Sequence, residues 1–181
     1  MTIDPAAFRN VLGQFATGIT VVTAMEDGAP VGFTCQAFAA LSLDPPMVAL
    51  APSKSSTSWP RMVKAGAFCV NVLAEDQEAL CRTFALSGGD KFAGVAWRLG
   101  DAGTPVLDGT LAWVECRLEA VHDAGDHELV TGRVQRLGVG TGEPLLFYRG
   151  RYRRLMPLPP QPPQPAPLNP EPPPPAPPLP G

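Results

Sequence analysis

One strand-like run carries small, alternating side chains at Thr34, Cys35, Gln36 and Ala37. Side chains of this size let a planar heterocycle lie close to the backbone, whose N–H and C=O groups then meet the polar edge of the ring. The sequence Leu43-Asp44-Pro45-Pro46 predicts a turn, because proline restricts its own backbone and that of the preceding residue. The pattern predicts a hairpin that lines a pocket for a flat, ring-shaped ligand.

A loop rich in hydroxyl groups follows this hairpin, at Ser53, Lys54, Ser55, Ser56 and Thr57. Where a strand leads into a helix, backbone N–H groups, the helix dipole and a lysine can converge on a phosphate. Ser and Thr runs before helices are mostly helix caps, however. The residues alone therefore leave a phosphate cradle and a simple cap both open.

The elements that position these residues are mainly strands. Runs rich in Val, Thr and aromatic residues, separated by Gly, Pro or Asp, predict strands over residues 19–24, 31–39, 47–51, 67–73, 111–121, 127–137 and 144–148. Three helices are also expected: an amphipathic one after Asp4-Pro5 that carries Phe8, Val11, Leu12 and Phe15, one capped by Ser56-Thr57-Ser58, and one over Glu75–Ala85. The order of elements predicts a mainly β barrel with a few short helices and disfavours a doubly wound sheet.

Composition predicts one folded domain over residues 1–156 and a disordered, Pro-rich tail over residues 157–181. Such a tail adopts an extended polyproline conformation, and it is either a solvated terminus or a ligand for an aromatic groove of another protein. The net charge of −3 becomes −2 without Glu171, the only charged residue of the tail. A charge this small predicts binding neither to nucleic acid nor to an anionic membrane.

The spacing of the cysteines and the sequence of the amino terminus indicate the redox state, metal content and location of the protein. The four cysteines lie far apart without a Cys-x-x-Cys motif, and only two histidines accompany them, which predicts reduced core thiols and no metal site. The first residues lack a basic start and an apolar leader segment, and no apolar run reaches the ~20 residues that span a bilayer. We expect a cytoplasmic protein.

Several common catalytic motifs are missing from the sequence. The segment 138–142 contains three glycines, but their spacing is wrong for a dinucleotide-binding Gly-x-Gly-x-x-Gly loop. Neither a Gly-Lys-Ser/Thr phosphate loop nor a Gly-x-Ser-x-Gly elbow is present. Rossmann, NTPase, kinase and α/β-hydrolase functions are therefore not supported.

Three blocks, Thr17–Thr23, Val31–Leu50 and Gly125-Asp126-His127, together resemble the short-chain flavin reductases that serve two-component flavin monooxygenases. The resemblance covers residues 5–155 and implies a split β-barrel with the FMN-binding fold, normally a homodimer. It implies an NAD(P)H:flavin oxidoreductase that reduces FMN or FAD with NADH, or alternatively with NADPH, and supplies a partner monooxygenase. Within the family, the strings GFTCQ, FCVNVL, DKFAG and LLFYRG are most similar to the reductase of an actinobacterial hydroxylase that acts on a phenolic seco-steroid.

The same resemblance implies roles for individual residues. His127 would face the nicotinamide, although a histidine at a strand start is more often an ordinary turn residue. Lys91 would reach the flavin phosphate or the edge of the ring, or else lie in solvent. Tyr148 and Tyr152 would stack on a nicotinamide or adenine ring, beside arginines that meet NADH phosphates or remain in water. The flavin-binding set is Gly32, Phe33, Thr34, Cys35, Gln36, Ala37, Ser53, Lys54, Ser55, Ser56, Thr57, Lys91 and Phe92.

Two other functions fit the same residues. The barrel also serves flavin-binding oxidases and sensors that do not reduce flavin with NADH, and fold alone does not separate these from reductases. The Gly125-Asp126-His127 block favours the reductase. A third reading makes the barrel a scaffold that presents the Pro-rich tail, and deletion of residues 157–181 would then abolish the effect without changing flavin chemistry.

Overall fold

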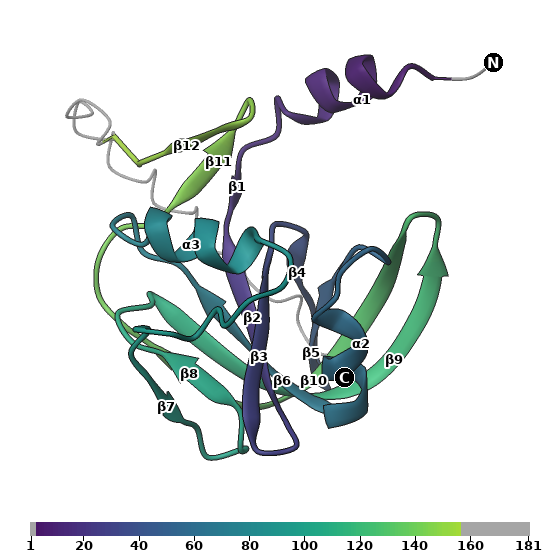
Figure 1. Cartoon of the computed structure of the whole chain (residues 1–181). Coiled ribbons are helices and arrows are strands. Elements are labelled where there is room, and N and C mark those ends of the chain that lie inside the picture. The colour runs from purple at the N-terminus through teal and green to yellow at the C-terminus, as the bar shows by residue number, and fades with distance from the viewer. Residues whose placement is uncertain (1–2, 157–181) are drawn as a thin grey trace, which may run out of the picture.

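The computed structural model describes residues 3–156, so the predicted Pro-rich tail lies outside the described residues. Strands contain far more of these residues than helices do (Figure 1). The helices are α1 (Pro5–Leu12), α2 (Trp59–Ala65) and α3 (Glu78–Ala85). The strands are β1 (Thr17–Gly18), β2 (Thr20–Glu26), β3 (Ala29–Cys35), β4 (Phe38–Leu43), β5 (Pro46–Leu50), β6 (Ala67–Val72), β7 (Trp97–Leu99), β8 (Pro105–Leu107), β9 (Ala112–Ala124), β10 (His127–Val139), β11 (Leu146–Tyr148) and β12 (Arg151–Arg153).

One antiparallel sheet of seven strands, in the order β3-β2-β6-β9-β10-β5-β4, forms the body of the domain. Its two edge strands, β3 and β4, are consecutive in the chain and are joined only by Gln36-Ala37. Such a short link requires the sheet to curl until its edges approach each other, which fits the right-handed twist of antiparallel strands. The sheet is therefore a barrel that stays open at Gln36-Ala37.

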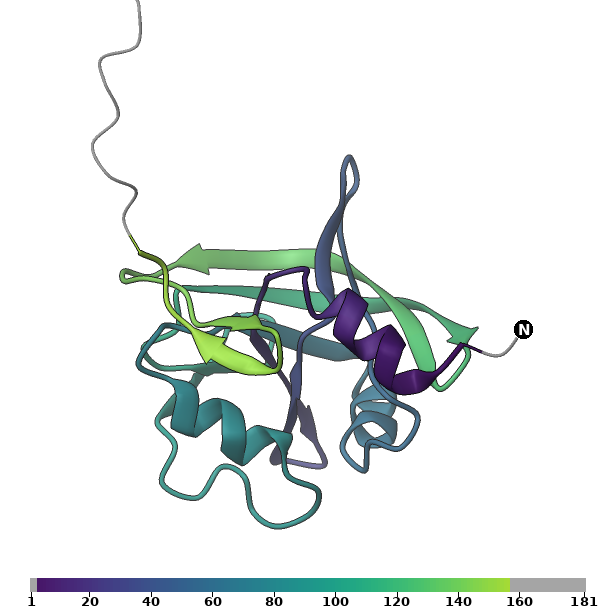
Figure 2. The ribbon, with the colours of Figure 1, turned by 90° about the horizontal axis from the view of Figure 1, so that it is seen from above.

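The longest pair of strands, β9 and β10, runs along one side of the molecule (Figure 2). The register of this pair shifts twice, between Thr131 and Gly132 and between Val134 and Arg136. Such irregularities bend a strand and increase its twist. The hairpin turn between the two strands places His127 at the first position of β10.

Two groups of apolar side chains fill the interior. Val22, Phe68 and Val130 belong to one group inside the main sheet, and Trp59 and Met62 of α2 cover it. Cys81 and Phe84 of α3 pack into a second group with Ile19, Leu107 and Leu145. Burying such side chains stabilises the fold by about 1.5–3 kcal/mol each before entropy is counted. The two helices therefore close the barrel on opposite sides of β3.

Helix α1 begins as the sequence predicts but is not part of the core. The Asp4 carboxylate accepts hydrogen bonds from the N–H groups of Ala6 and Ala7, and Pro5 occupies the first turn. None of its residues is buried, and Phe8, Val11 and Leu12 are all more than half exposed. Figure 1 shows α1 standing apart from the sheets. The amphipathic pattern therefore marks an apolar face that this chain alone leaves uncovered.

The predicted strands are confirmed as β2, β3, β5, β6, β9, β10 and β11, with two kinds of error. The run 31–39 is not one strand, because it breaks at Gln36-Ala37 where the barrel opens. Four short strands, β1, β7, β8 and β12, were not predicted, since two or three residues carry too little periodicity. The acidic run from Glu75 is also not the first turn of a helix, because α3 begins only at Glu78.

Other expectations concern cysteines, metals and membranes. The prediction of reduced core thiols is confirmed, since all four cysteines are free and buried. Within residues 3–156, no three His, Cys, Asp or Glu side chains gather in a way that would hold a metal ion. None of the helices in the same residues is long and apolar enough to cross a membrane.

Candidate functional site

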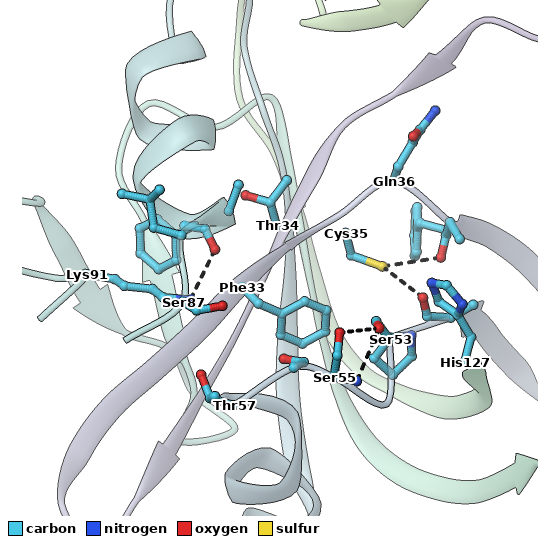
Figure 3. A pocket seen from close by; sticks show the side chains of 18 of the residues that line it. Phe33, Thr34, Cys35, Gln36, Ser53, Ser55, Thr57, Ser87, Lys91 and His127 are labelled. Carbon is cyan, nitrogen blue, oxygen red and sulfur yellow. Dashed lines mark hydrogen bonds between the residues drawn. The ribbon is translucent and has the colours of Figure 1, made fainter. Parts of the chain in front are cut away.

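A cavity of about 590 Å³ lies beside the opening of the barrel (Figure 3). Its wall combines the end of β3, the loop after β5, the carboxyl end of α3 and the first residue of β10. Apolar side chains such as Phe33 and Phe84 lie beside serine and threonine hydroxyls in this wall. Mostly preformed pockets with a few convergent polar groups are typical small-molecule sites.

The predicted ring-binding segment lies in this wall. Thr34 and Cys35 at the end of β3, and Gln36 and Ala37 in the link to β4, all line the cavity. The Thr34 hydroxyl donates to the carbonyl of Cys81 in α3, and the Gln36 amide donates to the Thr17 hydroxyl. These bonds fix the segment between two elements, so its shape is set before any ligand binds.

The loop after β5 brings its hydroxyl groups to the same cavity. Ser53, Ser55, Ser56 and Thr57 all line it. Ser53 and Ser55 share a hydrogen bond of 2.8 Å, and the Ser53 hydroxyl oxygen also accepts from the Ser55 N–H. Ser56 does act as a cap, because its hydroxyl oxygen accepts from the N–H of Trp59 at the start of α2. The loop therefore serves α2 through Ser56 and offers hydroxyls to the cavity.

Lys91 lies at the opposite end of the cavity from His127 (Figure 3). Its ammonium donates to three oxygens: the carbonyls of Gly32 and Phe84 and the hydroxyl of Ser58. Partial burial lowers the pKa of Lys91. The lysine is thus held by the protein at the cavity wall and is not the solvated loop residue of the alternative reading.

His127 lines the cavity and is oriented by its neighbour. Its Nδ1 lies 2.7 Å from the Asp126 carboxylate, and the imidazole remains partly exposed. The hydrogen bond from His127 lowers the pKa of Asp126. With Nδ1 engaged, Nε2 is the ring nitrogen left to meet a ligand, as in sites where one nitrogen is fixed by a carboxylate.

Five residues of the predicted set do not line this cavity. Gly32 and Phe92 border a neighbouring cavity of about 420 Å³ that also includes Lys91. Tyr152 borders a smaller one of about 140 Å³ with Thr34 and Gln36, and Tyr148 stacks beneath the Arg149 guanidinium. Lys54 directs its ammonium to Asp123 and to the carbonyl of Gly125. The structure thus gathers eleven of the sixteen predicted residues around one cavity.

Sequence reasoning missed part of the wall because those residues come from elements with other expected roles. Phe15 was assigned to the apolar face of the first helix, and the residues at the end of α3 carry no motif. The additional lining residues are Phe15, Thr17, Phe38, Ala51, Pro52, Phe84, Ala85, Leu86 and Ser87. Two of these residues are polar and stand directly before glycine: Ser87 before Gly88-Gly89, and Thr17, which opens a block that carries the family resemblance.

Cys35 in the cavity wall is expected to be unreactive. Burial raises the pKa of its thiol to about 11, so only about one molecule in a thousand carries the thiolate at pH 8. Because the raised pKa keeps the thiol protonated, reactivity should increase only as the pH rises toward that value. A disulfide reagent should leave the native protein unmodified at pH 8 and label four thiols after unfolding; rapid labelling of the native protein would contradict this.

Several known proteins are similar to this chain in sequence and in fold. Residues 12–156 match the family model described as a flavin reductase like domain. The chain is 53% identical over 156 residues to a Rhodococcus jostii protein named flavin-dependent monooxygenase, reductase subunit HsaB, covering 86% of this chain and 80% of the relative.

Two solved structures are also similar. Nitrilotriacetate monooxygenase component B from Mycobacterium thermoresistibile has 48% identity and a TM-score of 0.81, with 86% of this chain and 90% of that chain covered. The Streptomyces globisporus NADH:FAD oxidoreductase SgcE6, in complex with NAD and FAD fragments, has 35% identity and a TM-score of 0.80, with 87% and 98% covered. The predicted resemblance and the split-barrel fold are confirmed. This chain belongs to the flavin reductase family.

Proposed function

We propose that this protein oxidises NADH and reduces a diffusible flavin, FMN or FAD, which then supplies a flavin-dependent monooxygenase. One observation carries the proposal: the segment predicted to bind a ring, a hydroxyl-rich loop and an oriented histidine converge on one cavity. Related proteins bear matching names, a monooxygenase reductase subunit and an NADH:FAD oxidoreductase. A cytoplasmic location and a steroid-hydroxylating partner remain predictions from the sequence.

For hydride transfer between two rings, the main task of the protein is to position those rings. A bound flavin would supply the hydride acceptor, because its ring can stack on the nicotinamide ring. Thr34–Ala37 would support the ring system, and the hydroxyls of Ser53, Ser55 and Thr57 would hold the ribityl phosphate. His127 would border the nicotinamide, and Phe33 contributes an apolar wall that excludes water.

A simple assay tests this function. The protein is mixed with NADH or NADPH and with free FMN or FAD, in air and without oxygen, and loss of the nicotinamide absorbance is followed. Oxidation that requires added flavin and saturates with it is expected, and kcat/KM ranks the two flavins and the two nicotinamides. Flavin binding without turnover would contradict the proposal and favour the oxidase or sensor.

The phosphate assignment gives a separate prediction. Ser55→Glu places a carboxylate beside the proposed phosphate, and repulsion of about 1 kcal/mol between such charges corresponds to about a fivefold loss of affinity. We therefore expect weaker binding of FMN and little change in the binding of riboflavin, which has no phosphate. Fluorescence titration with both flavins measures this. Equal losses for the two flavins would contradict a phosphate site in the loop.

A homodimer is also proposed. Phe8, Val11 and Leu12 form an apolar face on α1 that is exposed in the single chain. Exposed apolar patches of this kind commonly mark protein interfaces. We expect sedimentation to give twice the mass of the chain, and Val11→Glu to weaken that association. A monomer at all concentrations would contradict the dimer without bearing on flavin chemistry.

A further inference from the structure

Lys54 belongs to the loop that lines the cavity, yet its ammonium is turned toward the β9–β10 hairpin. The Nζ atom lies 2.5 Å from Oδ2 of Asp123 and 2.6 Å from the carbonyl oxygen of Gly125. A short charge-assisted bond to a carboxylate is stronger than one between neutral groups. Two acceptors in the hairpin turn thus engage the cation that sequence reasoning had assigned to the flavin phosphate.

The turn that receives this ammonium is narrow and has a defined conformation. Gly125 has a φ of +75°, which side-chain-bearing residues rarely adopt. The Asp123 carboxylate accepts a hydrogen bond from the Gly125 N–H through its other oxygen, and Lys54 lowers the pKa of this carboxyl. Asp123 therefore connects the turn to Lys54, because one of its oxygens binds the turn and the other binds the ammonium.

Main-chain contacts extend the connection to both sides of His127. The N–H of Lys54 donates to the Asp126 carbonyl, and Ser53 pairs with His127 as an isolated antiparallel bridge. On the other side, the N–H of Glu128 donates to the Pro52 carbonyl. The hydroxyl-rich loop and the start of β10 consequently form one local unit, and Lys54 supplies its side-chain link.

We propose that Lys54 and Asp123 are positioning residues, which hold the turn 123–126 so that His127 faces the cavity at a fixed place relative to the hydroxyl-rich loop. Neither side chain belongs to the cavity wall, and the Asp123 side chain is 80% exposed. The proposal rests on the proposed function, because it assigns His127 to the nicotinamide. The proposal gives different roles to two adjacent residues of the loop: Ser55 contacts the flavin phosphate, whereas Lys54 acts through His127.

Steady-state kinetics of Lys54→Met, Asp123→Asn and the double variant test the proposal. An exposed charged pair contributes up to about 1 kcal/mol, so each single variant should raise the KM for NADH about three- to fivefold. Their KM for FMN should stay within about twofold of the unsubstituted protein. The double variant should be no worse than the single ones, since both remove the same link.

Lys64→Met is a matched control, because Lys64 is an exposed lysine whose nearest acid is Glu26 at 3.9 Å, away from the hairpin. Its constants should not change. If Lys54→Met instead weakens FMN but not riboflavin, Lys54 is a phosphate ligand and the proposal is wrong. Unchanged constants in Lys54→Met and Asp123→Asn would also overturn it.

A second measurement does not depend on activity. The chain has only His122 and His127, so the imidazole signals in an NMR spectrum can be assigned with a His122→Gln variant. Lys54→Met should shift or broaden the His127 signals while the melting temperature stays close to that of the unsubstituted protein. Unchanged His127 signals would contradict the positioning role. Inactivity of the unsubstituted protein with NADH and flavin would instead contradict the proposed function.

Discussion

Glu115→Ala is expected to lower the free energy of unfolding by about 3–5 kcal/mol. Glu115 lies near the start of β9 and is fully buried. Its carboxylate accepts hydrogen bonds from the N–H groups of Ala102 and Thr104 and from the Thr104 hydroxyl. Removing it leaves three donors without their acceptor and a cavity in the interior. Urea unfolding followed by tryptophan fluorescence measures the change.

Two further variants give this prediction its controls. Glu115→Gln keeps the shape but brings an NH₂ group among donors, so a smaller loss than that of Glu115→Ala is expected. Glu119→Gln removes a carboxylate four residues along the same strand, where it is partly exposed and paired with Arg133. Its effect should be far smaller, because solvent screens such pairs. Equal losses for Glu115→Ala and Glu119→Gln would show that burial does not determine the effect.

His127→Ala is expected to lower kcat/KM for NADH about tenfold or more and to leave flavin affinity within about twofold. His127 is held beside Asp126 at the end of the cavity away from Lys91. Its loss removes a group that would border the nicotinamide and leaves the hydroxyl-rich loop intact. Initial rates at varied NADH, with FMN binding measured separately by fluorescence, test the separation.

His122→Ala is the matched control, since this second histidine lies in β9 and is not among the residues that line the cavity. It should leave both constants unchanged. If His127→Ala has the kinetics of the unsubstituted protein, His127 has no role in nicotinamide binding. If flavin affinity falls as much as kcat/KM, the imidazole contacts the flavin instead.

The strands and helices were largely predictable because their signals are local. Alternation and β-branched residues locate β2, β6 and β9, while Asp4-Pro5 starts α1. The break at Gln36-Ala37 was not predictable, since residues 31–39 contain neither proline nor a glycine near that point to indicate that the strand ends there. The apolar face of α1 was correctly recognised as amphipathic, but its pattern does not say whether the same chain covers it.

In the candidate site, too, local features were predictable from the sequence and long-range contacts were not. Residues next to each other in sequence, such as Ser53 and Ser55, could be grouped because one loop carries them, and the family resemblance added His127. The placement of Lys54 could not be predicted, because its partners Asp123 and Gly125 are about 70 residues away. The burial of Glu115 likewise could not be predicted, since a glutamate in a strand is ordinarily exposed. The loop around Gly100 is what covers this side chain.

The sequence by itself determined the mainly β fold and the membership in the flavin reductase family, and it suggested the segments proposed to hold a ring and a phosphate. Those properties depend on residue types and on their spacing over a few positions, because these directly determine the local backbone preferences. Only the tertiary structure decided which of these segments face one cavity and which charged groups are paired with other groups of the same chain. That decision depends on contacts between strands distant in the chain, where burial and hydrogen-bond geometry outweigh local preference.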